Sequence, residues 1–272
     1  MDGSPSDILE ASHIMLSGVG ALTERRLWDD GVGTLQDFAS SGRLRGFSPE
    51  RKRALDGEAV RALAAHRLGE ADLLASLLPH AEAWRLYARF HRDAAFLDIE
   101  TTGMSRYSAV TVVGVHRPGR PFQALVRREG LSAASITQAL EGAKLLVTFN
   151  GAGFDVPFIR GAFPAAKLPP AHLDVLACAR RLGWRGGLKA IERSLGLARD
   201  LETRVLAGND AVRLWRTYER TGSTNALRLL VAYNRADCEN LEPVARASVA
   251  AMMARLAPPG GRRPRQAALP GA

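Results

Sequence analysis

Two acidic residues near the middle of the chain have types and spacing that suit a metal site. Asp98 and Glu100 stand in the stretch FLDIETTG, at the end of an apolar run. If that run is a strand, residues i and i+2 point to one face and the two carboxylates share it. They would repel each other unless a cation lay between them, and magnesium prefers carboxylate and water oxygens. The polar rim of an ordinary strand end explains the pair equally well.

Two further motifs carry acids. In TFNGAGFDVPFI, Asp155 begins an expected helix after a glycine-containing loop, where it could be a ligand, an N-cap or both. In AYNRADCENL, Tyr233 and Asp237 are spaced i and i+4 on an expected helix and share a face. The alternative there is a partly buried tyrosine beside a surface acid. Together the motifs offer four carboxylates, about the number that two Mg²⁺ or Mn²⁺ ions roughly 4 Å apart need. Tyr233 would then orient or help to deprotonate the attacking water.

The elements that must position these residues are short β-branched runs followed by helices. We expect strands over residues 94–100, 109–116, 122–128, 144–150 and 172–176. The first three suggest an antiparallel meander, and a helix over 132–143 would return the fourth strand in parallel. Further helices are expected over 188–197, 209–220 and 225–255. This order predicts an α/β fold, a mixed five-stranded sheet flanked by helices.

The first 92 residues have helical spacing instead. Ser48 is an expected N-cap with Pro49 at the first helical position. The stretch MLSGVGALTERRLWDDGVGTLQDF resembles a helix-hairpin-helix, in which backbone N–H groups around Gly18 and Gly20 could receive a phosphate. An α-hairpin that only packs on the rest of the chain is the alternative. The motif predicts a small core of five residues: Leu27, Trp28, Val32, Leu35 and Phe38.

The composition of the chain indicates the kind of partner it binds and the cellular compartment it suits. The 272-residue chain has a net charge of +9 and is 46% hydrophobic, which suits a folded protein that binds nucleic acid. The alternative is that the positive charge reflects the base composition of the genome, because almost all the basic residues are arginine. Cys178 and Cys238 are far apart and predict buried thiols in a reducing compartment. No signal peptide or apolar span is recognisable, so we expect a cytoplasmic protein without a membrane segment. The basic, Pro/Gly-rich residues 257–272 are expected to be disordered.

The motifs DIETTG, NGAGFD and YNRAD resemble the three exonuclease motifs of the DnaQ-like, four-carboxylate 3′-5′ exonucleases of the ribonuclease H-like superfamily. One subgroup has a histidine where this chain has Ala232, and the other has a tyrosine where this chain has Tyr233. The chain therefore resembles the tyrosine subgroup. Over residues 93–255 its sequence is most similar to bacterial YprB-type ribonuclease H-like proteins. The resemblance implies an exonuclease domain over 93–256, a two-metal site at the four carboxylates and a DNA or RNA substrate.

Further residues are candidates for contact with the substrate. Thr101, Thr102, Gly103 and Asn150 adjoin the carboxylate motifs, and Arg185 and Lys189 belong to a basic stretch that lines a groove or is simply a solvated face. Asp174 could assist the site without being a ligand. Two other functions remain open. One is an endonuclease with the same metals, and the other is a non-catalytic nucleic-acid-binding protein on a nuclease fold.

Overall fold

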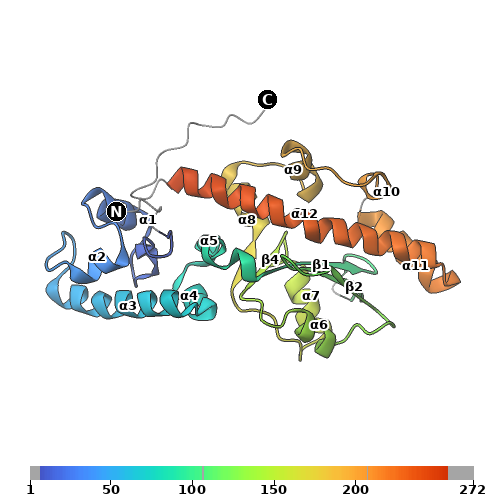
Figure 1. Ribbon diagram of the computed structural model, residues 1–272, viewed down its shortest axis with the longest axis horizontal. Helices are drawn as coiled ribbons and strands as arrows, with labels where there is room; N and C mark the ends of the chain where they lie inside the picture. Colours follow the sequence, from blue (N-terminus) through green and yellow to red (C-terminus); the bar gives the residue numbers. More distant parts are fainter. Residues whose placement is uncertain (1–6, 106, 207, 257–272) are drawn as a thin grey trace. The chain divides into compact units, whose positions relative to one another are not determined.

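The computed structural model describes residues 7–105, 107–206 and 208–256, which form two compact units (Figure 1). Among the described residues, one unit contains 7–91 with 249–256, and the other contains 92–248. The tail for which we predict disorder, residues 257–272, lies outside the described residues.

The second unit is built on a five-stranded sheet. Its spatial order is β3-β2-β1-β4-β5. The strand that carries Asp98 and Glu100 is β1, and it therefore lies at the centre of the sheet. The first three strands pair antiparallel, whereas β4 pairs parallel to β1 and β5 parallel to β4. The mixed sheet expected from the sequence is confirmed. Its strands are β1 (Ala94–Thr101), β2 (Val110–His116), β3 (Gln123–Val126), β4 (Leu145–Thr148) and β5 (His172–Asp174).

Helices cover both faces of this sheet. Leu97 and Ile99 of β1 belong to a buried cluster with residues of α6 (Ala133–Ala139) and α7 (Asp155–Ala162). A second cluster joins β2 to α11 (Gly208–Thr221) and α12 (Thr224–Leu256). Figure 1 shows α12 on one side of the sheet and α6 and α7 on the other. Because side chains alternate along a strand, Asp98 and Glu100 face the α12 side.

Three strands end two residues earlier than expected. The third strand ends at Val126 rather than Arg128, which has a left-handed φ of 69°. The fourth strand ends at Thr148 rather than Asn150, which has a left-handed φ of 66° that a strand cannot contain. The fifth ends at Asp174 rather than Leu176, because the Asp174 carboxylate caps α8 (Val175–Leu182) by accepting from the Leu176 N–H at 3.0 Å. The remaining helices of this unit are α9 (Leu188–Ser194) and α10 (Leu201–Arg204).

The first unit is helical, as expected. The Ser48 hydroxyl accepts from the Arg51 N–H and Pro49 begins α3, which confirms the predicted helix start. The five residues predicted to form a small core, Leu27, Trp28, Val32, Leu35 and Phe38, are all buried. The elements are η1 (His13–Met15), α1 (Ala21–Asp29), α2 (Leu35–Ser40), α3 (Pro49–Leu68), α4 (Ala71–Leu77), η2 (His80–Glu82) and α5 (Arg85–Phe90). The short helix η3 (His91–Asp93) begins at the last residue of this stretch and continues into the second unit, where it leads into β1.

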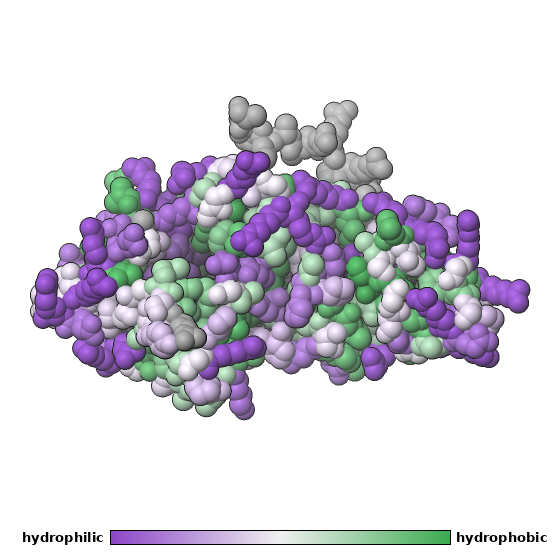
Figure 2. Space-filling view, turned by 180° about the vertical axis from the view of Figure 1, so that it is seen from behind, coloured by the Kyte–Doolittle hydropathy of each residue, from purple (hydrophilic) through white to green (hydrophobic). Residues whose placement is uncertain are grey.

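The surface carries mostly polar side chains. Hydrophilic residues cover much of the face seen in Figure 2, and hydrophobic residues show in smaller areas between them. Both cysteines are buried, in agreement with the prediction. None of the described helices is long and apolar enough to cross a membrane.

Candidate metal centre

Three carboxylates from two elements meet above the centre of the sheet. Asp98 and Glu100 come from β1 and Asp237 comes from α12, and one oxygen of each lies within 4.8 Å of the others. Glu100 and Asp237 are buried, and Asp98 is half-buried. The period of two along β1 therefore brings the first pair to one face, and the packing of α12 supplies the third acid.

The electrostatics of this group favour a cation. Burial raises the pKa of Asp98 and of Glu100 well above the usual range, and the charge of Asp237 raises both further. Among the described residues, the buried Glu100 Oε1 has no hydrogen-bond partner. Crowded carboxylates with an unsatisfied oxygen are costly in a protein interior, and they are the ligands that Mg²⁺ and Mn²⁺ accept. The residues present therefore fit a divalent metal.

Asp155 lies beside this group but is not one of the three. It is the first residue of α7, and Phe154 occupies the N-cap position, so the expectation that Asp155 is an N-cap is wrong. Its Oδ1 instead accepts from the Ile99 N–H at 3.0 Å, between Asp98 and Glu100 in the chain. Burial raises the pKa of Asp155 to about 7, and its negative charge contributes to the raised pKa of Asp98.

Tyr233 lines the same cleft as the carboxylates, one turn before Asp237 on α12. Burial raises its pKa, and the charge of Asp237 raises it further, so the phenol keeps its proton at neutral pH. The Lys189 ammonium lies 4.5 Å from the centroid of the Tyr233 ring and donates to the Leu206 carbonyl. Lys189 is thus engaged with the protein itself.

Asn234 is a site residue that the sequence analysis missed. Its Nδ2 donates to Asp98 Oδ2 at 2.9 Å and to the Asp98 carbonyl at 3.1 Å. Gly114 of β2 pairs with Asp98 in the sheet, and a Cβ there would lie 1.9 Å from Asn234 Oδ1. A glycine inside the strand VTVVGVH is the local signal that could have indicated this close approach of helix to sheet.

Arg199 is a second residue that the sequence analysis missed. Its guanidinium donates to the Asp237 carboxylate and to both oxygens of Glu192, at 2.5 and 2.6 Å. The side chains of Arg199 and Glu192 are only 4% and 2% exposed. This buried pair holds the side chain of Asp237 from the α9 side of the site.

Asp174 holds the loop that precedes Asp155. Besides capping α8, its carboxylate accepts from the N–H groups of Asn150 at 2.8 Å and Ala152 at 3.1 Å. These bonds fix the backbone where Asn150 takes its left-handed conformation. Asp174 is therefore a positioning residue and not a member of the group of three.

The carboxylates open onto a cleft of about 580 Å³. Thr101, Thr102 and Gly103 line it, and the Thr101 hydroxyl donates to the Gly103 carbonyl at 2.6 Å. Asn150, Arg185 and Lys189 are not among the described residues that line it. Residues of α11 form another part of the wall: Gly208, Asn209, Val212, Arg213 and Arg216.

The predicted phosphate-binding hairpin belongs to the first unit. Gly18 has a left-handed φ of 70°, and Gly20 is the N-cap of α1. The Ser17 N–H beside them donates to Glu58 Oε2 at 2.7 Å, and Arg51 Nη2 donates to the Gly18 carbonyl at 3.1 Å. A carboxylate thus already binds one N–H group of the hairpin.

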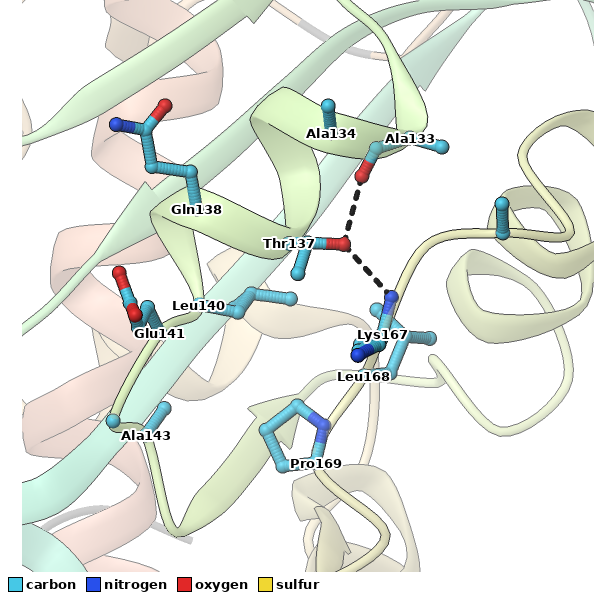
Figure 3. Close-up of a pocket in the computed structure, with 12 residues that line it drawn as sticks. Ala133, Ala134, Thr137, Gln138, Leu140, Glu141, Ala143, Lys167, Leu168 and Pro169 are labelled. Carbon is cyan, nitrogen blue, oxygen red and sulfur yellow. Dashed lines mark hydrogen bonds between the residues drawn. The ribbon is translucent and has the colours of Figure 1, made fainter.

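A larger hollow, of about 800 Å³, is lined by α6 and residues 165–169 (Figure 3). The Thr137 hydroxyl donates to the Ala133 carbonyl at 2.8 Å and accepts from the Lys167 N–H at 3.0 Å. None of the four candidate carboxylates is among its lining residues. Its size does not make it the better candidate, because its lining offers no cluster of ligating groups.

Comparison with known proteins agrees with the fold. A comparison with curated proteins finds no match. A family model of the RNase H superfamily matches residues 95–249, more than half of the chain and the segment that holds all five strands except the first residue of β1. The chain belongs to the RNase H superfamily.

Proposed function

We propose that this chain is a 3′-5′ exonuclease of the DnaQ-like type, tyrosine subgroup, most similar to YprB-type proteins. Membership of the superfamily and the acidic cluster indicate a metal-dependent nuclease that acts on nucleic acid. The observation that carries the finer proposal is the convergence of Asp98, Glu100 and Asp237 in one cleft with Tyr233.

In this proposal Asp98, Glu100, Asp155 and Asp237 would hold two Mg²⁺ or Mn²⁺ ions. When bound, such ions help to activate a water and to stabilise the leaving 3′ oxygen. Tyr233 would orient the attacking water or help to deprotonate it, and in the metal-free site its phenol keeps the proton that such a hydrogen bond to the water needs.

Other residues would bind and align the strand. Thr101, Thr102 and Gly103 would contact the terminal nucleotide, since they line the cleft beside the carboxylates. Gly18 and Gly20 would bind a phosphate of the nucleic acid. Bulkier residues at both glycines should weaken binding of long strands and spare cleavage of short ones, and unchanged binding would contradict this role.

A cleavage panel tests the proposal. Labelled single- and double-stranded DNA and RNA are incubated with Mn²⁺, with Mg²⁺ and with EDTA. We expect nucleoside monophosphates released from free 3′ ends only when metal is present. Asp98→Asn should abolish cleavage, whereas Asp72→Asn, an exposed acid on α4, should not. Full activity of a clean Asp98→Asn preparation would refute the site.

The same panel separates the alternatives. An exonuclease cannot begin on a circle, so cleavage of a circular strand would indicate an endonuclease with the same metals. Binding of nucleic acid without metal binding or cleavage would indicate a non-catalytic protein.

A further inference from the structure

Helix α11 forms a basic wall of the cleft that holds the carboxylates. Ala211 and Trp215 are buried in the cluster with β2 and α12, and this fixes the rotation of the helix. Arg213 and Arg216 then line the cleft, together with Asn209. Residues three and four apart share a helix face, so these three positions form one continuous strip.

The arginines of this wall are not used to neutralise the carboxylates of the cleft. Arg213 Nη2 pairs with Asp210 Oδ1 on its own helix at 2.6 Å, and the Arg213 side chain is 77% exposed. Arg216 is exposed and, within the described part of the chain, has no ion-pair partner. Among the carboxylates, Asp237 is already paired with the buried Arg199. The Arg216 guanidinium is therefore available to an anion that enters the cleft, and Arg213 is available through the N–H donors that Asp210 does not bind.

The chemistry of the two walls defines that anion. The part of the anion that reacts must bind the divalent metal held by the carboxylates. The part beside it must bind guanidinium groups, which bind phosphate oxygens through a planar fork of N–H donors. A nucleic-acid strand meets both conditions because it carries a phosphate at every nucleotide. A substrate with a single phosphate could use the carboxylate side alone.

We propose that Arg213 and Arg216 bind phosphate groups of the nucleic-acid strand next to the bond that is cleaved. This inference rests on the proposed function, because it takes the carboxylate cluster as the place of cleavage. It assigns strand binding to α11 and not to Lys189, whose ammonium is engaged with Leu206 and Tyr233.

The test measures binding of a labelled single-stranded oligonucleotide to the full chain in EDTA, across a series of salt concentrations. Each lost phosphate contact on a single strand lowers the slope of log affinity against log salt by about 0.7, so Arg213→Gln/Arg216→Gln should flatten it by about 1.4. Arg213→Lys/Arg216→Lys keeps both charges and should keep most of the slope. Arg220→Gln removes a charge from the same helix without altering the cleft lining, and should leave the slope unchanged.

Activity in Mn²⁺ provides the second measurement. The double Gln variant should raise KM for an oligonucleotide by a larger factor than KM for bis(p-nitrophenyl) phosphate, which has one phosphodiester. An unchanged salt slope, or equal losses in the Arg220→Gln control, overturns the role of the two arginines. If the wild type cleaves neither substrate but the slopes change as expected, the binding role stands and the exonuclease proposal fails.

Discussion

Asn234 on α12 donates a hydrogen bond from Nδ2 to the carboxylate of Asp98 on β1, with 2.9 Å between the two atoms. The same nitrogen binds the Asp98 carbonyl, so both the side chain and the backbone of Asp98 are held from the helix. This contact joins residues 136 positions apart. It fixes the orientation of one carboxylate within a cluster whose members otherwise repel each other.

Replacing Asn234 by Ala should weaken metal binding. Removal of a group that orients a ligand typically costs about 10–100-fold in metal affinity, because the ligand then samples unproductive orientations. Calorimetric titration with Mn²⁺ measures the loss directly. Asn225→Ala, at the exposed start of the same helix, is the matched control and should bind Mn²⁺ as the wild type does. Equal affinity in Asn234→Ala would show that the contact does not support a metal ligand.

The stability of the metal-free protein should fall as pH rises from about 4 to 7. The pKa of Asp155 is raised from 3.8 to about 7 on folding, chiefly by burial, and the pKa values of Asp98 and Glu100 are raised as well. Over this window the folded protein holds more protons from these groups than the unfolded chain does, and their contribution to the free energy of unfolding therefore decreases.

Thermal unfolding in EDTA between pH 4 and 8 measures this dependence. Asp155→Asn should have a flatter profile, because the amide oxygen can still accept from Ile99 but does not titrate. Mn²⁺ should raise the Tm most at pH 8, where the carboxylates it binds are deprotonated most readily. The prediction would be contradicted if the Tm of the metal-free wild type rose between pH 5 and pH 8, and rose by as much as the Tm of Asp155→Asn.

Asp174 gives a prediction that separates a positioning role from metal ligation. Asp174→Ala leaves the N–H groups of Asn150, Ala152 and Leu176 without their acceptor, and loss of the cap alone costs about 0.5–2 kcal/mol. Asp174→Asn keeps Oδ1, which serves Asn150 and Leu176, so it should retain much of the stability and of the activity. Urea unfolding and cleavage rates measure the two effects. Complete loss of activity in a folded Asp174→Asn protein would instead indicate a metal ligand.

The buried pair of Arg199 and Glu192 should matter far more to stability than an exposed pair. Arg199→Met leaves the carboxylate of Glu192 buried without its partner, which costs about 3–5 kcal/mol. Arg228→Met removes the same type of side chain from an exposed pair with Glu202 and should change the midpoint of urea unfolding little. Similar midpoints for the two variants would refute a structural role for the Arg199 pair.

Several features of the fold could be predicted because they depend on neighbours in sequence. The helix start at Ser48 and Pro49 follows from local capping chemistry. The common face of Asp98 and Glu100 follows from the period of a strand, and that of Tyr233 and Asp237 from the period of a helix. The end of β5 was misjudged, because the carboxylate of Asp174 caps α8 by accepting from the Leu176 N–H. Its bonds to the N–H groups of Ala152 and Asn150, 22 and 24 positions earlier, follow from no local pattern.

The sequence by itself determined the mixed five-stranded sheet, the two pairs of site residues and the charge that suits a polyanion. Only the tertiary structure decided that Asn234 orients Asp98, that Arg199 holds Asp237, and that Arg213 and Arg216 line the cleft. The physical reason is that these contacts depend on how α11 and α12 pack against the sheet. That packing is set by distant apolar residues and by the absence of a side chain at Gly114, so the roles of the polar residues cannot be read from their own neighbours in the chain.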